Sequence, residues 1–193
     1  MPIDRWVLDQ ACRQLVQWND ERPGRPPPTV AVNVSGRQLS EPGVVEAVAE
    51  VLDRHGLDPA LLCLEVTETA MLQEGSAQAV FERLSALGVR IALDDFGTGY
   101  SSLGQLQRFP VNILKIDRSF VVRVHTRGDE SPIVAAVTAM ARALGMRTVG
   151  KVIETEEQLA GLTRLGCDDG QGYLLARPAA PEDLRDLLGL APA

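Results

Sequence analysis

Asp94 and Asp95 are adjacent carboxylates that end an apolar stretch covering residues 89–93. A glycine-punctuated, hydroxyl-rich segment follows them, with the sequence Phe96-Gly97-Thr98-Gly99-Tyr100-Ser101-Ser102. Like charges this close at the end of a buried strand repel one another unless a positive charge lies between them. The pair therefore indicates either a bound cation or the capping of the following helix, for which Asp pairs are also used.

Polar residues also follow the other apolar stretches of the chain. They are Asn33 and Ser35; Glu65, Thr67 and Glu68; Lys115 and Asp117; Lys151 and Glu154; and Gln171. Each could by itself be a helix cap, and Thr67-Glu68-Thr69 and Ser101-Ser102 are good capping sequences. The recurrence of the pattern on every stretch favours a shared site over a series of unrelated caps.

Four of these residues, Asn33, Glu65, Asp94 and Asp95, form an all-oxygen set of side chains. Such sets suit hard cations, here Mg²⁺ or Mn²⁺. A carboxylate pair on one strand is well placed to bridge two metal ions about 3.5–4 Å apart, the arrangement used in phosphoester hydrolysis. Lys115, two positions before Asp117, would bring a positive charge to a phosphate or to a water molecule.

Hydrophobic periodicity divides the chain into alternating strands and helices. Near-continuous apolar stretches predict strands over residues 29–34, 61–66, 89–93, 113–116, 147–153 and 170–175. Helical spacing predicts helices over residues 6–18, 42–54, 76–87, 101–108, 132–144, 156–165 and 181–188. Three of these helices are expected to stop at a glycine, namely Gly88, Gly145 and Gly166.

This alternation predicts an α/β fold in which a parallel sheet is covered by helices. Six strand–helix units fit either an open doubly wound sheet or a (β/α)₈ barrel that lacks its first strands. No glycine-rich phosphate loop follows the first predicted strand, so a dinucleotide site is not expected. The carboxyl ends of parallel strands share one face, which would gather the polar residues there.

Composition limits the classes of partner. The 193 residues suffice for one domain with a sizeable core. The net charge of −7 argues against a nucleic-acid partner, and neither a membrane-spanning stretch nor a signal peptide is visible. Cys12, Cys63 and Cys167 are scattered, which favours a reducing, cytoplasmic location over a disulfide framework or a zinc site. Of the 19 basic residues only Lys115 and Lys151 are lysines, and both lie in or at the end of apolar stretches.

Five segments follow one another in a recognisable order: AVNVSGRQL, LEVTET, LDDFGTGYSSL, LKIDRSFV and GQGYLLARP. In this order and spacing they resemble the EAL-domain family of bacterial cyclic-di-GMP phosphodiesterases, over essentially the whole chain. The resemblance implies a modified TIM (β/α)₈ barrel of EAL type with one reversed strand. It also implies hydrolysis of cyclic di-GMP to linear pGpG with two Mg²⁺ or Mn²⁺ ions.

The resemblance assigns roles position by position. It implies metal ligands at Asn33, Glu65, Asp94 and Asp95. Among catalytic residues, Lys115 matches the catalytic lysine, Gln171 supports the water and metal network, and Glu154 anchors the Asp-Asp-Phe-Gly loop. Ser35, Asp117 and Gln171 are implied to contact the substrate. The implied partners are cyclic di-GMP, a second copy of the chain in a homodimer, and fused or separate sensory or GGDEF domains.

The chain departs from the family at its start. MPIDRWVLDQAC resembles the family just after its first two strands. We therefore expect residues 1–193 to form a single EAL domain that lacks the strand with the Glu-Ala-Leu signature. That strand carries a metal-binding Glu, and a phosphate-binding Arg lies near it.

The second departure reverses a charge. The family's AEGVET segment reads here Gly150-Lys151-Val152-Ile153-Glu154-Thr155, so Lys151 stands where a metal-binding Glu is expected. At about 4 Å and an effective dielectric constant near 20, one ammonium–carboxylate contact is of order 4 kcal/mol before desolvation. We expect Lys151 to bind Asp94 and Asp95 directly and to displace the second metal ion.

Three interpretations of the function follow. The chain is an EAL phosphodiesterase cut short at its N-terminus, a degenerate EAL module that binds cyclic di-GMP or a protein without hydrolysis, or an unrelated metal hydrolase on a similar barrel. The intact Asp-Asp-Phe-Gly-Thr-Gly loop, Lys115 and Gln171 favour the phosphodiesterase fold. The loss of both acids favours little or no activity. We therefore predict a phosphodiesterase-type domain with little or no activity and at most one weak metal site.

Overall fold

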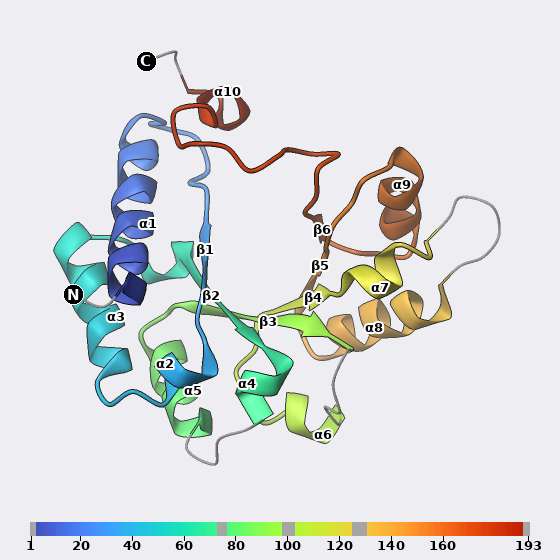
Figure 1. The fold of residues 1–193 in the computed structure, drawn as a ribbon, viewed down its shortest axis with the longest axis horizontal. Coiled ribbons are helices and arrows are strands. Elements are labelled where there is room, and N and C mark those ends of the chain that lie inside the picture. The colour runs from blue at the N-terminus through green and yellow to red at the C-terminus, as the bar shows by residue number, and fades with distance from the viewer. Residues whose placement is uncertain (1–2, 73–76, 98–102, 125–130, 191–193) are drawn as a thin grey trace.

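The computed structural model describes residues 3–72, 77–97, 103–124 and 131–190 (Figure 1). Its strands are β1 (Val30–Asn33), β2 (Leu62–Thr67), β3 (Arg90–Phe96), β4 (Ile113–Ile116), β5 (Arg147–Gly150) and β6 (Asp169–Gly170). Its helices are α1 (Ile3–Asp20), α2 (Gly36–Leu39), α3 (Val44–His55), the 3₁₀ helix η1 (Pro59–Leu61), α4 (Glu68–Leu72), α5 (Ala77–Ala86), α6 (Leu103–Leu106), α7 (Arg118–Val121), α8 (Pro132–Ala143), α9 (Glu156–Arg164) and α10 (Arg185–Leu188).

The six strands form one parallel sheet in the order of the chain, from β1 to β6. The sheet curls into a half-barrel, with its helices on the outer face (Figure 1). The predicted α/β fold and the alternation of strands with helices are confirmed. The curl also decides between the two predicted architectures, because it is the geometry of a partial TIM barrel rather than of a flat doubly wound sheet.

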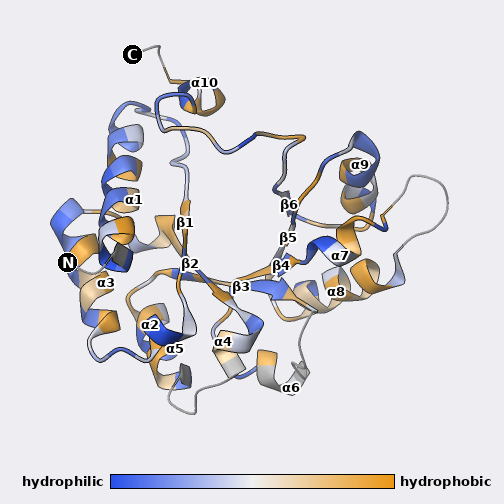
Figure 2. Ribbon diagram, in the orientation of Figure 1, coloured by the Kyte–Doolittle hydropathy of each residue, from blue (hydrophilic) through white to orange (hydrophobic). Residues whose placement is uncertain are grey.

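Burial of apolar faces explains where the helices lie. Helix α3 packs Val45, Val48, Val51 and Leu52 inward and ends at Gly56 in the left-handed region. Strand β2 is buried almost throughout, which is expected of a parallel strand covered by helices. Figure 2 shows the apolar residues concentrated on the strands and on the helix faces turned toward them. Thr155 starts α9 with a reciprocal cap to Gln158.

The C-terminal third of the chain differs from the prediction. Residues 170–175 were expected to be a strand, but β6 ends at Gly170 and turns follow it. The predicted strand 147–153 likewise ends at Gly150, and the predicted helix 181–188 keeps only α10. The backbone of Gln171 and Leu174 is instead hydrogen-bonded to Ile153, so the two segments continue side by side without strand geometry.

Two contacts tie the end of the chain back to its beginning. Arg185 of α10 pairs with Glu21 at 2.6 Å, and Arg25 donates a hydrogen bond of 2.9 Å to the carbonyl oxygen of Gly189. The segment between β6 and α10 therefore runs across the open side of the half-barrel toward the end of α1 (Figure 1). We call residues 171–184 the C-terminal strap.

The described residues contain no helix that is both long and apolar enough to cross a membrane. Cys12 and Cys63 are buried free thiols, and burial raises the pKa of each to about 11. Thiols with such a pKa are weak nucleophiles at neutral pH.

The two outer strands should make the domain self-associate. In the described residues β1 and β6 do not pair with each other, and unpaired strand edges are templates for another chain. Light scattering coupled to size-exclusion chromatography should show oligomers that increase with concentration. Ala31→Lys, on the exposed position of β1, should reduce them, whereas Ala79→Lys on the exposed face of α5 should not. A clean monomer at all concentrations would contradict this prediction.

Candidate metal and phosphate site

The polar residues predicted from the strand ends do gather at one edge of the sheet. Asn33 ends β1 and is paired in register with Glu65 of β2. Asp94 and Asp95 lie near the end of β3, Lys115 lies in β4, and Lys151 comes directly after β5. Because side chains alternate between the two faces of a strand, Glu65, Asp94 and Lys115 all point to the inner face of the half-barrel.

Charged groups of alternating sign form a continuous chain across this edge. The Lys115 Nζ atom lies 2.6 Å from Glu65 Oε2 and 3.8 Å from Asp94 Oδ1. The Lys151 Nζ atom lies 2.7 Å from Asp94 Oδ1 and 2.7 Å from Asp95 Oδ1. We call these five residues the carboxylate–lysine network. The direct binding of Lys151 to both aspartates, expected from the charge reversal, is confirmed.

The network is mostly withdrawn from solvent. The Lys115 side chain is 5% exposed and the Lys151 side chain 18%, whereas Asp95 at the end of the chain of charges is 43% exposed. Burial alone would lower the pKa of Lys151, but its hydrogen bonds and ion pairs with Asp94 and Asp95 outweigh this and raise it above its ordinary value. Lys151 is therefore positively charged throughout the neutral pH range.

The donor set leaves no place for a divalent ion between Asp94 and Asp95. Asn33, Glu65 and Asp94 offer oxygen atoms, and Lys115 and Lys151 already contact those of Glu65 and Asp94. The space between Asp94 and Asp95, however, is spanned by the Lys151 ammonium group. Within the described residues no group of three or more His, Cys, Asp or Glu side chains is arranged to hold an ion. The residues therefore do not fit a second metal ion between the two aspartates.

In the described part of the Asp-Asp-Phe-Gly loop, the contact that holds Gly97 belongs to Glu68. Glu68 is 2% exposed, and its Oε2 atom accepts a hydrogen bond of 3.1 Å from the Gly97 backbone N–H. Glu154 is solvent-exposed, with Oε1 at 3.8 Å from Arg118, and its role in anchoring the loop stays a prediction. Glu68 begins α4 directly after β2, beside β3, whereas Glu154 lies beyond β5. Residues 98–102 of the loop, including Ser101 and Ser102, lie outside the described residues.

Ser35 and Asp117 each cap a short helix. The Ser35 hydroxyl accepts a hydrogen bond from the Gln38 backbone, and Asp117 accepts one of 2.9 Å from the Ser119 backbone. Burial would raise the pKa of Asp117, but the hydrogen bonds from Ser119 outweigh it and hold the pKa below its usual value. The capping alternative is thus confirmed for both, and their contact with a substrate stays a prediction.

A cavity of about 650 Å³ lies between the network and the C-terminal strap. Its lining includes Glu65, Asp94, Lys115, Lys151 and, on the strap, Gln171, Tyr173 and Arg177. This volume is typical of a small-molecule site. Gln171, predicted from the sequence, thus shares a cavity with the network. Tyr173 and Arg177 were not predicted, although both lie in the GQGYLLARP segment that contains Gln171.

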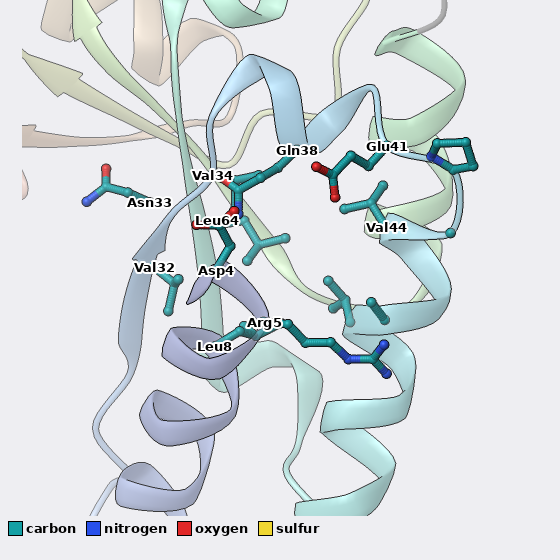
Figure 3. Close-up of a pocket in the computed structure, with 14 residues that line it drawn as sticks. Asp4, Arg5, Leu8, Val32, Asn33, Val34, Gln38, Glu41, Val44 and Leu64 are labelled. Atoms are coloured by element: carbon teal, nitrogen blue, oxygen red, sulfur yellow. The ribbon is translucent and has the colours of Figure 1, made fainter. Parts of the chain in front are cut away.

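A smaller cavity of about 180 Å³ lies outside the sheet, where the start of α1 meets β1 and the segment from α2 to α3 (Figure 3). Val34, Leu64 and Val44 give it an apolar wall, and the Asn33 side chain points away from them (Figure 3). Asn33 also lines the cavity of about 650 Å³ beside the carboxylate–lysine network.

Two residues of the site have a backbone conformation that favours glycine. Asp95 and Val152 both have φ of 55°. An Asp tolerates this conformation, but a β-branched residue there is strained. Val152 stands where the family segment AEGVET has glycine, and it immediately follows Lys151. The Lys151 ammonium group is therefore presented by a strained turn.

The EAL domain family matches residues 1–178 of the chain. The bifunctional diguanylate cyclase/cyclic di-GMP phosphodiesterase MucR of Pseudomonas aeruginosa is 47% identical over 183 residues, which are 94% of this chain and 26% of MucR. The first eight curated relatives are matched over only 22–30% of their own lengths.

Solved structures agree with this match. The PaMucR phosphodiesterase in complex with c-di-GMP is 44% identical, with a TM-score of 0.87, over 94% of this chain and 73% of that chain. The calcium and cy-diGMP complex of Klebsiella pneumoniae BlrP1 is 30% identical, with a TM-score of 0.80, over 92% of this chain and 44% of that chain.

Val152→Gly should stabilise the domain. A non-glycine residue in a sparsely populated backbone region costs about 1–3 kcal/mol, and the entropy of glycine offsets about 0.5–1 kcal/mol of the relief. A net gain of about 1 kcal/mol raises the Tm of a domain of this size by about 2–4 °C. Thermal unfolding followed by circular dichroism measures the shift.

The matched control is Val122→Gly, at an exposed residue with an ordinary φ of −57°. This substitution should lower the Tm, because it adds chain entropy without relieving strain. Equal losses of stability in the two variants would contradict the assignment of strain to Val152.

Proposed function

The chain belongs to the EAL domain family, and on that premise we propose that it binds cyclic di-GMP at the cavity of the carboxylate–lysine network and hydrolyses it with little or no activity. The observation that carries this proposal is the Lys151 ammonium group at 2.7 Å from both Asp94 and Asp95. Relatives support the ligand, because the PaMucR phosphodiesterase was solved in complex with c-di-GMP.

The charges of the site favour an anion without a bridging metal. Lys151 supplies an ammonium group where an active two-metal site needs an acid and a divalent ion. With Lys115 and Arg177 the cavity lining carries three positive side chains against the two carboxylates of Glu65 and Asp94. A phosphodiester carries one negative charge, which such a lining can accept directly. Cyclic di-GMP therefore fits the cavity as a bound ligand better than as a substrate.

Asn33, Glu65 and Asp94 would hold the one divalent ion that the site can accept, Mg²⁺ or Mn²⁺. Such an ion polarises a phosphoryl oxygen when bound. Lys115 lies within ion-pair distance of both Glu65 and Asp94, so it orients these carboxylates and offers a proton donor at the same place. Two-metal hydrolysis also requires a second ion opposite the first, and the Lys151 ammonium group stands in its place.

The setting of the domain follows the relatives. MucR is a bifunctional diguanylate cyclase/cyclic di-GMP phosphodiesterase, and this chain matches about a quarter of its length. We therefore place the domain beside sensory or GGDEF-type domains, in the cytoplasm, where the free thiols of Cys12 and Cys63 remain reduced. Homodimer formation is part of the same proposal and is tested by the scattering experiment above.

The chain should convert cyclic di-GMP to pGpG very slowly. Loss of a single preorganised stabilising group commonly costs about 10²–10³ in rate, and an ammonium group occupies the second metal position. Chromatography of reactions with Mn²⁺ should show turnover well below about 1 s⁻¹, the low end of ordinary enzyme rates. The MucR phosphodiesterase domain serves as the active reference. Turnover equal to that of the reference would refute the proposal of low activity.

Lys151→Glu should strengthen metal binding. The substitution removes a positive charge and returns a carboxylate beside Asp94 and Asp95, which favours a divalent ion. Calorimetric titration with Mn²⁺ should find at most one weak site in the wild-type chain and tighter or additional binding in the variant. Lys151→Gln removes only the charge and should lie between them. Two tight sites in the wild-type chain would show that Lys151 does not exclude the second ion.

A further inference from the structure

The smaller cavity, of about 180 Å³, has a floor of apolar side chains from α1, β1 and α3 (Figure 3). These side chains are Leu8, Val32, Val34, Val44 and Val48. Leu8, Val32 and Val48 are at most 8% exposed, so the floor of the cavity is part of the hydrophobic core. An apolar cavity of about 150 Å³ is large enough to hold a benzene molecule. The space therefore suits a single aromatic ring or a short alkyl chain.

Two carboxylates lie at the solvent side of this cavity. Asp4, in the first turn of α1, and Glu41, between α2 and α3, both line it and are both exposed. Among the described residues no positively charged side chain pairs with Asp4. Glu41 lies 3.9 Å from Arg37, whose side chain is 90% exposed, and an ion pair of this kind contributes little. The entrance of the cavity therefore keeps a negative charge.

The positive charge of the described lining is already paired. Arg5 forms an ion pair with Glu50 of α3, and Figure 3 shows its guanidinium group pointing away from Glu41. Gln38 is also engaged, because its Oε1 atom accepts hydrogen bonds from the Ser35 backbone at 2.6 Å and from the Ser35 hydroxyl at 2.8 Å. An occupant of the cavity would thus meet an apolar floor on one side and carboxylates without a close cation on the other.

From this arrangement we propose that the smaller cavity is a binding site for a small primary ammonium compound. Its ring or alkyl chain packs against the apolar floor, and its ammonium group donates charge-assisted hydrogen bonds to Asp4 and Glu41. A carboxylate or phosphate of the same size would face two like charges and is rejected. The site lies outside the sheet, apart from the carboxylate–lysine network, so this inference does not depend on the binding of cyclic di-GMP.

Titration of the full chain with benzylammonium chloride, followed by methyl NMR spectroscopy, tests the site. The methyl signals of Val44, Val48 and Leu64 should shift together, with a Kd of about 1 mM, which is reasonable for a ligand of eight non-hydrogen atoms. Benzyl alcohol has the same ring without the charge and should bind about threefold to tenfold more weakly. Benzoate should cause no shift of these signals.

Two variants separate the apolar floor from the carboxylates. Ala47→Leu should abolish binding, because the added carbon atoms occupy the cavity that Ala47 lines, and Leu forms helices almost as well as Ala. Asp4→Asn combined with Glu41→Gln should lower the affinity for benzylammonium to that for benzyl alcohol. Asp20→Asn removes an exposed carboxylate at the other end of α1 and should bind as the wild type does. Melting curves verify that each variant is folded.

The possible outcomes decide the inference. Absence of the methyl shifts in the wild-type chain at about ten times the expected Kd overturns the site, and unchanged binding in Ala47→Leu does the same, because the ligand then lies elsewhere. Equal affinities of the wild type for benzylammonium and benzyl alcohol overturn the recognition of a cation. Full affinity for benzylammonium in the doubly substituted variant overturns the assignment of that recognition to Asp4 and Glu41.

Discussion

The ammonium group of Lys151, held between the carboxylates of Asp94 and Asp95, sets the charge of the whole site. A family site with an acid at this position would present carboxylates that repel one another until divalent ions neutralise them. Here the Lys151 side chain offsets the charge of these carboxylates throughout the neutral pH range. Because it is covalently attached, no binding equilibrium is involved. Under the proposed function, this moves the chemistry of the site from metal-assisted hydrolysis toward recognition of an anion.

The network also explains why its members lie where they do. Buried charges are stable only when they are paired, and the alternation from Glu65 through Lys115, Asp94 and Lys151 to Asp95 gives each ammonium group two carboxylates. Removing a member would leave a partly buried charge without its counterpart. The network thus links the ends of β2, β3, β4 and β5, and its geometry depends on the parallel register of these strands.

The strained turn at Val152 and the C-terminal strap together position the charged and aromatic side chains of the site. Val152 follows Lys151 in a conformation with φ of 55°, and the strap is hydrogen-bonded to the same short segment. A strained backbone persists only where the surrounding contacts define it. The strap supplies those contacts, and it also brings Tyr173 and Arg177 to the cavity. One turn therefore positions both the cation and the aromatic ring.

Local patterns in the sequence were sufficient for much of the fold. Hydrophobic periodicity and the alternation of strands with helices along the chain predicted the parallel sheet. A strand that is buried on both faces shows a continuous apolar stretch. The charge reversal at Lys151 predicted its ion pairs, because two adjacent carboxylates need a positive neighbour. The strand predicted over residues 170–175 was wrong, since an apolar stretch does not distinguish a strand from a strap packed on a neighbouring turn.

Only the tertiary structure decided which distant groups meet. The backbone N–H of Gly97 is bound by Glu68, because Glu68 starts a helix beside the end of β3. The left-handed turn at Val152 likewise lies where two segments about twenty residues apart are hydrogen-bonded side by side. Residue types along the chain determine which groups are available to the site. Distances between strand ends determine which of them interact, and those distances arise only when the sheet curls.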